Sequence, residues 1–174
     1  MAAAEHSRAG DVASADRVVV RPARADDLDV VTELRLALLR EHGQNPVYRR
    51  VRPDAPTRAR RLYAAQLAST SEVTLLAEVG GAVVGILRCV ENAGYPLLFP
   101  HAYGYISSVY VRPAARRRGV LRALLDAATS WCRARDLHEL RLHNAADNPQ
   151  SNAAWAALGF GVVEHLRMRT IEED

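Results

Sequence analysis

The stretch VYVRPAARRRGVLRALL, residues 109–125, joins an expected strand to an expected helix through an arginine-rich turn. The first turn of a helix leaves backbone N–H groups unpaired and carries partial positive charge. Gly119 allows close approach to the backbone, and the guanidinium groups around it favour anions. The segment therefore predicts a site for a diphosphate. A solvated basic turn in front of a core helix explains the same residues, and the segment alone does not separate the two.

On both sides of this segment, the chain alternates between strand and helix patterns. Runs of β-branched residues between turn residues predict strands, and apolar residues at intervals of three and four predict helices. This order predicts an α/β (α+β) fold, with a mixed, mostly antiparallel central sheet of about six strands flanked by helices. We expect strands at 17–21, 72–79, 82–90, 105–111, 139–143 and 160–171. We expect a first helix that begins near Asp26 to Asp29 and ends before Gly43, and further helices at 56–68, 118–134 and 149–158.

Composition sets the class of protein. Residues 1–16 are small and polar without periodicity, so we expect a flexible N-terminal tail and then a single domain over residues 17–174. The hydrophobic share of 49% excludes intrinsic disorder, and two cysteines are too few for a disulfide scaffold. No apolar stretch approaches the roughly 18 residues of a membrane-spanning helix. Two unpaired thiols and an N-terminus without a signal-peptide pattern predict a cytoplasmic protein.

The charges give little support for a nucleic-acid partner. All 23 cationic residues are arginine, against 20 acidic residues, for a net charge of +3. The arginines gather in residues 49–61 and 112–122, without the interleaved aromatic residues that stack on bases. We therefore expect no nucleic-acid partner. The scattered histidines and cysteines lack ligand spacing, so we also predict no metal site.

Two motifs resemble those of a known enzyme family. Arg116 and Gly119 fit the first and fourth positions of (Q/R)-x-x-G-x-(G/A), the acetyl-CoA signature of the GCN5-related N-acetyltransferases, although Leu121 stands at the sixth. The sequence DNPQSNAAWAALGF, residues 147–160, resembles the family's second signature, an asparagine-led helix that ends in Leu-Gly-Phe. The expected order of elements over residues 17–171 resembles that of the family as well. The resemblance implies this family's acyl-CoA N-acyltransferase fold and acetyl-CoA as co-substrate.

The resemblance places the cofactor where the strand before the arginine turn separates from its parallel neighbour. Backbone groups of Val109 and Val111 would pair with the pantetheine, and amides of residues 117–122 would hold the diphosphate. Asn148 would hydrogen-bond the pantetheine arm from the start of a helix. The residues implied in cofactor binding are Val109, Tyr110, Val111, Arg116, Arg117, Arg118, Gly119, Val120, Leu121, Arg122, Asn148 and Ser151.

The catalytic groups are less clearly marked. Trp155 stands at the position of the family's frequent tyrosine, which is the proton donor to the leaving thiolate. An indole N–H donates a hydrogen bond but does not act as an acid at physiological pH. A packing role in the core explains Trp155 equally well. The amine must lose a proton before it attacks. The strand segment that matches the family's base holds no carboxylate, so we retain Tyr105 and Glu91 as catalytic candidates and interpret His143 as structural. Further titratable candidates are Glu33, Glu41, His42 and His101.

Together these features predict an N-acetyltransferase. It would pass the acetyl group of acetyl-CoA to a primary amine of a small molecule or peptide, by direct attack in a ternary complex. The alternative is a non-catalytic acyl-CoA-sensing domain of the same fold, which Trp155 and the carboxylate-free strand favour. Turnover of any amine separates the two. We expect no membrane partner, and either a monomer or a homodimer.

Overall fold

The computed structural model describes residues 17–171, so the predicted flexible tail, residues 1–16, lies outside the described residues. The chain divides into two compact units, one that ends at His143 and one that begins at Asn144. The single domain expected over residues 17–174 stays a prediction.

The first unit holds a five-stranded sheet whose strands follow chain order, β1-β2-β3-β4-β5. Neighbouring strands are antiparallel from β1 to β4, whereas β5 runs parallel to β4. Gly80 and Gly81 join β2 to β3 at φ values of 57° and 78°, which a two-residue hairpin turn requires. The strands are β1 (Val19–Pro22), β2 (Glu72–Val79), β3 (Ala82–Ala93), β4 (Ala102–Val111) and β5 (Leu140–Leu142).

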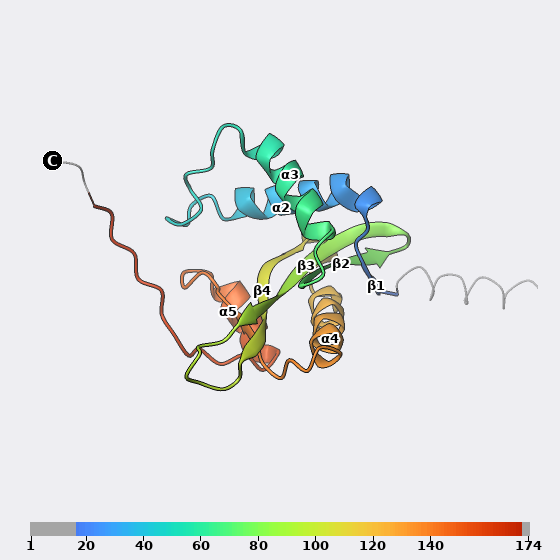
Figure 1. Ribbon diagram of the computed structural model, residues 1–174. Helices are drawn as coiled ribbons and strands as arrows, with labels where there is room; N and C mark the ends of the chain where they lie inside the picture. The colour runs from blue at the N-terminus through green and yellow to red at the C-terminus, as the bar shows by residue number, and fades with distance from the viewer. Residues whose placement is uncertain (1–16, 172–174) are drawn as a thin grey trace, which may run out of the picture. The chain divides into compact units, whose positions relative to one another are not determined.

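Helices cover both faces of this sheet (Figure 1). Helices α2 (Leu28–Glu41) and α3 (Ala55–Leu67) lie on one face, and α4 (Val120–Arg133) lies on the other. Helix α4 also supplies the crossover that two parallel strands need. The remaining described helices are η1 (Ala25–Asp27), η2 (Pro113–Ala115) and, in the second unit, α5 (Pro149–Ala157).

Alternate residues of β3 pack against the two helical layers. Ile86 is buried with Leu34 of α2 in one apolar cluster. Its neighbour Gly85 faces α4, where a side chain would meet Val120 at 3.0 Å. Successive strand residues point to opposite faces, so the sheet serves as the centre of two cores.

The fold class is confirmed, but the strand count and several strand ends differ from the prediction. The sheet has five strands rather than about six, because residues 160–171 form no strand. A β-type sequence forms a strand only where it pairs with other backbone, and this segment makes no such pairing among the described residues. Its apolar side chains are therefore exposed, Val163 by 88%. The connection expected over residues 91–104 is partly strand, because β3 and β4 pair as far as Ala93 and Ala102.

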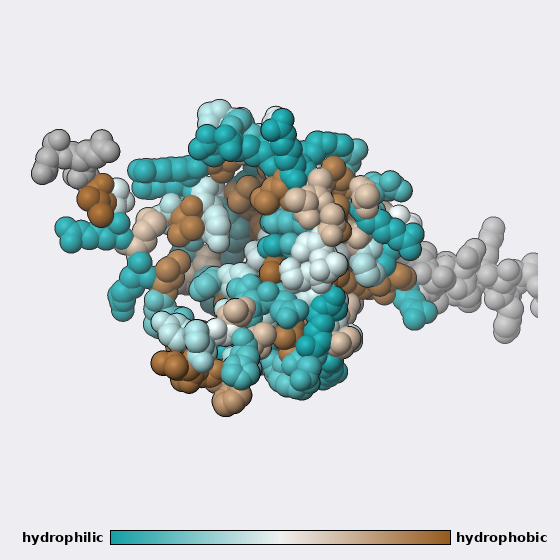
Figure 2. Space-filling view, viewed as in Figure 1, coloured by the Kyte–Doolittle hydropathy of each residue, from teal (hydrophilic) through white to brown (hydrophobic). Residues whose placement is uncertain are grey.

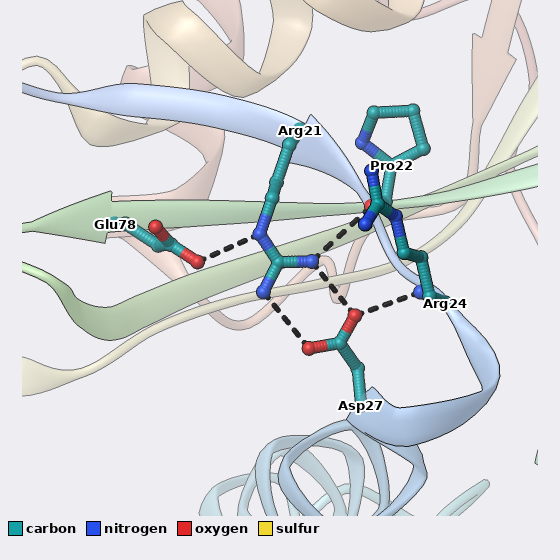
Figure 3. Close-up of polar contacts among 5 residues, drawn as sticks. All are labelled: Arg21, Pro22, Arg24, Asp27 and Glu78. Carbon is teal, nitrogen blue, oxygen red and sulfur yellow. Dashed lines mark hydrogen bonds and ion pairs between the residues drawn. The ribbon is translucent and has the colours of Figure 1, made fainter.

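Arg21 of β1 connects the first strand to β2 and to η1, the short helix before α2, through hydrogen bonds (Figure 3). Its Nε donates to Glu78 of β2 at 2.8 Å, and its terminal nitrogens donate to both carboxylate oxygens of Asp27 at 2.7 and 2.8 Å. The Asp27 carboxylate also accepts from the N–H of Arg24 at 2.7 Å. These bonds, that of Arg21 foremost, stabilise the charged form and hold the pKa of Asp27 below its usual value.

Apolar side chains are exposed at the tip of the β3–β4 hairpin, where Figure 2 shows a brown patch. They belong to Tyr95, Leu97, Leu98 and Phe99. Contiguous exposed apolar groups of this kind mark surfaces that contact a ligand or another protein. In the part of the chain that the structure describes, no helix is long and apolar enough to cross a membrane.

We expect Asp27→Asn to lower the free energy of unfolding by about 1–2 kcal/mol at pH 7, because it removes a charged acceptor from Arg21. The lowered pKa makes this stabilisation complete above the pKa of an unfolded aspartate, about 3.9, and it is lost as pH falls through the folded-state pKa. Thermal unfolding from pH 3 to pH 8 measures it: the melting temperatures of the variant and the parent should differ at neutral pH and converge in acid. Asp26→Asn, at an exposed neighbouring position, is the control; a pH-independent gap for Asp27→Asn would contradict the expectation.

Candidate active site

Strand β4 leaves its parallel neighbour at a β-bulge. The register between β3 and β4 shifts between Arg88 and Cys89, so that Ser107 is the extra residue. The pairing of β4 with β5 ends at the same point, with Ile106 opposite Leu142. Over residues 107–111, β4 therefore has an edge without a strand neighbour among the described residues.

The backbone groups that this edge presents are those of Val109 and Val111. The N–H of Arg112 donates to Val84 of β3 at 2.8 Å. Because backbone groups of successive strand residues point to opposite sides, those of Tyr110 point to β3 and those of Val109 and Val111 point to the open edge. This is the arrangement expected for pairing with a pantetheine, but it does not include the backbone of Tyr110.

The arginine turn ends in an uncapped helix N-terminus. Gly119 is the residue before α4 and has a φ of 79°, a conformation that favours glycine. No side chain caps this end, and the first helical bond is that of the Ala123 N–H to Gly119 O at 3.0 Å. The amides of Val120, Leu121 and Arg122 therefore have no acceptor within the helix, and together with the helix dipole they suit an anion. Leu121 contributes its backbone N–H here, so the departure from the family motif leaves this donor in place.

The arginines of the turn serve two different purposes. Arg116 donates from Nε to Val111 O at 3.0 Å and from Nη2 to Glu41 of α2 at 2.5 Å. Arg112 pairs with Glu33 of α2 at 2.9 Å. Both side chains thus bind the turn to α2 instead of facing an anion. Arg117 and Arg122 carry no ion pair within residues 17–171, which leaves their guanidinium groups for a diphosphate.

A polar aromatic cluster lies on the sheet face that α2 and α3 cover. Tyr105 Oη and His143 Nδ1 are 2.7 Å apart. Next to them, the guanidinium of Arg141 lies 4.0 Å from the centre of the Tyr103 ring. Burial in the first place, with Tyr48 and Tyr103 nearby, raises the pKa of Tyr105. The sequence pattern did not predict the contact between Tyr105 and His143; alternation along β5 was the available signal, because it places residues 141 and 143 on one face.

The structure does not bring the two proposed bases together. Glu91 is two residues beyond Cys89, whose Sγ lies 3.7 Å from that of Cys132 in α4. Strand alternation therefore directs Glu91 to the α4 face. Tyr105 pairs with Val90 and shares the opposite face, so Glu91 and Tyr105 are separated by the sheet.

The second unit holds the remaining predicted residues. Asn148 is the N-cap of α5, and its Oδ1 accepts from the Ser151 N–H at 3.0 Å. Ser151 Oγ in turn donates to Asn144 Oδ1 at 2.7 Å. Local bonds thus use the Asn148 carbonyl and the Ser151 hydroxyl, while no partner is found for the Asn148 amide nitrogen within the described residues. The Trp155 ring packs edge-on to Phe160 with centroids 5.2 Å apart, as a packing role requires.

Known proteins resemble this chain in sequence. Residues 36–160 match the model of the acetyltransferase (GNAT) family. Among curated proteins, the aminoglycoside N(6')-acetyltransferase type 1 of Klebsiella aerogenes is 38% identical over 63 residues, which are 36% of this chain and 41% of that protein. The match thus spans less than half of the relative's length.

Solved structures share the fold. The aminoglycoside 6'-N-acetyltransferase AAC(6')-Ig of Acinetobacter haemolyticus superposes with a TM-score of 0.72 at 24% identity, over 90% of this chain and 99% of that one. A Clostridium acetobutylicum protein described as a predicted acetyltransferase, solved with acetyl-CoA, gives 0.71 at 19% identity, over 88% and 96%. Because the family model covers most of the chain, the protein belongs to the acetyltransferase (GNAT) family.

Proposed function

We propose that the protein transfers the acetyl group of acetyl-CoA to a primary amine of a small molecule, by direct attack in a ternary complex. The observation that carries this proposal is the open edge of β4 directly before an uncapped helix N-terminus. A diphosphate needs clustered N–H donors and cations, and a pantetheine needs strand-like backbone partners. One continuous segment, residues 107–122, offers both in the order in which CoA carries them.

The chain's own groups would divide the work of binding along this segment. The first-turn amides of α4, with the guanidinium groups of Arg117 and Arg122, would hold the diphosphate. The backbone of Val109 and the N–H of Val111 would pair with the pantetheine and fix the thioester at the bulge. Arg116 would position the turn from behind, because its side chain is bound to Val111 O and Glu41.

The acceptor would bind on the face that carries Tyr103 and Tyr105. The carboxylates of the surrounding elements are neutralised by arginine, so a polycation would find few free anionic partners. These ion pairs join Glu33 to Arg112, Glu41 to Arg116, Glu72 to Arg88 and Glu139 to Arg141. This balance favours a small amine of low charge, although the curated relative is an aminoglycoside acetyltransferase. The cytoplasmic location and the monomeric or homodimeric state stay predictions.

The second candidate is an acyl-CoA-sensing domain without turnover. Two observations favour it: Trp155 supplies no acid, and no carboxylate stands on β4 between residues 105 and 108. The contact between Tyr105 Oη and His143 Nδ1 weighs against it, because it brings two titratable side chains together next to the bulge of β4.

The first test separates binding from turnover. We expect acetyl-CoA at about a hundred times its dissociation constant to stabilise the protein by roughly 2–3 kcal/mol in thermal unfolding. Thiol release with tyramine, kanamycin and a peptide N-terminus as acceptors then measures transfer; Cys89 and Cys132, exposed by 0% and 2%, should add little background. Stabilisation without thiol release from any amine would support the sensing domain. An intact fold that millimolar acetyl-CoA does not stabilise would contradict both readings.

The second prediction concerns the diphosphate site. We expect Gly119→Glu to abolish acetyl-CoA binding in calorimetry, because a carboxylate would stand where the diphosphate lies. Gly81→Glu is a matched control: Gly81 has a φ of 78° against 79° for Gly119, and a Cβ at either position meets nothing within 4 Å. Both variants carry the same backbone strain, so only the location differs. Equal acetyl-CoA affinity in the two variants would mean that the turn is not the diphosphate site.

The third prediction concerns the leaving thiolate. We expect Trp155→Phe to retain kcat within about threefold, because a CoA thiolate departs without a protein acid. Trp155→Tyr should then bring no gain. If a missing acid limits the rate, the phenol of Trp155→Tyr should instead raise kcat by about tenfold or more. Unfolding measurements accompany the kinetics, since Trp155→Ala should cost about 3–5 kcal/mol through lost packing.

A further inference from the structure

A tyrosine and a histidine lie in contact beside the bulge of β4. Tyr105 and Arg141 are paired across β4 and β5, and His143 follows Arg141 by two residues on the same face. The 2.7 Å contact between Tyr105 Oη and His143 Nδ1 therefore links the two strands where their pairing ends. The thioester proposed along Val109 would lie on the same strand, just beyond the bulge.

Tyr105 is poorly suited to act as a base by itself. Burial and the neighbouring Tyr48 and Tyr103 raise its pKa, so the phenol keeps its proton at neutral pH. A phenol can still pass a proton on if its own proton has a destination. An imidazole that accepts the phenolic hydrogen bond at Nδ1 is such a destination, provided that Nε2 carries the other proton.

We propose that Tyr105 and His143 form a two-residue proton relay for the acceptor amine, with Tyr105 in contact with the amine, directly or across one water, and His143 as the positioning residue behind it. The inference rests on the proposed acetyl transfer and assigns a base that the carboxylate-free strand otherwise lacks.

The proposed acetyl transfer starts from a neutral amine. The amine nitrogen attacks the thioester carbonyl carbon, a C–N bond forms, and the C–S bond breaks with its electron pair on sulfur. One amine proton passes to Tyr105 Oη while the phenolic proton passes to His143 Nδ1. The products are an amide, the CoA thiolate and an imidazolium, which releases its proton to solvent.

Two tyrosines and an arginine surround the Tyr105–His143 pair. Tyr103 of β4 and Tyr48, from the segment between α2 and α3, influence Tyr105 electrostatically. Arg141 is the cation on the β5 side; it lies over Tyr103 and pairs with Glu139 at 2.7 Å.

The experiment compares His143→Gln with His138→Gln in the full chain. Glutamine keeps a hydrogen-bond partner for Tyr105 but takes up no proton, and His138 is an exposed histidine that precedes β5. The assay follows thiol release with tyramine or kanamycin, whichever the acceptor panel shows to react. We expect His143→Gln to lower kcat about 100-fold, with KM for acetyl-CoA within about threefold. We also expect it to remove a rising limb of kcat with pH that the parent and His138→Gln share.

Two further variants keep the outcome decisive. Tyr105→Phe should show the same loss as His143→Gln, and the double variant should lose no more, because both residues act in one relay. His143→Ala should regain activity with added imidazole, which a structural defect would not do. An unchanged pH limb in His143→Gln, or no imidazole rescue in a folded His143→Ala, would overturn the relay. A parent protein that binds acetyl-CoA but turns over no amine would instead overturn the proposed function.

Discussion

One extra residue in β4 is the constraint on which the site depends. Without the bulge at Ser107, β4 and β5 could remain paired toward Val111, and the backbone groups of Val109 and Val111 would be used within the sheet. A bulge costs part of the hydrogen-bond ladder, and it persists because the neighbouring structure compensates. Here β3 pairs with β4 on both sides of the bulge, and Gly104 lets β4 lie tightly against Cys132 and Leu140. The pairing with β3 and the close packing at Gly104 thus fix the place where β4 separates from β5.

The turn between β4 and α4 depends on α2 as well. Arg112 and Arg116 project back from the turn to Glu33 and Glu41, which lie two helical turns apart on α2. The same helix contributes Leu34 to the core beneath the proposed acceptor face. If an acceptor displaced α2, the ion pairs of Arg112 and Arg116 would therefore pull on the turn that carries the proposed diphosphate donors. In the proposed arrangement, both substrates would depend on the position of α2 although they would contact different elements.

The sequence was sufficient where the signal is local. The turn, Gly119 and the helix after it could be predicted because one short segment contains the strand end, the glycine and the apolar spacing. The role of Arg116 could not, since its carboxylate partner is 75 residues away in the chain. The contact of His143 with Tyr105 could not be predicted for the same reason, because it exists only through the pairing of β4 with β5. The strand predicted over residues 160–171 shows the opposite error, a β-type pattern without a neighbouring strand in the described structure.

The all-arginine composition has a chemical consequence for a protein proposed to hold a thioester. A lysine that could reach the bound thioester would present an amine at high local concentration, which favours acylation. Acylation would remove the positive charge of that lysine. A guanidinium stays protonated and has no free nucleophilic lone pair, so it can hold an activated acyl donor without reacting with it. With every one of its 23 cations an arginine, the chain carries no side-chain amine that could consume its own co-substrate.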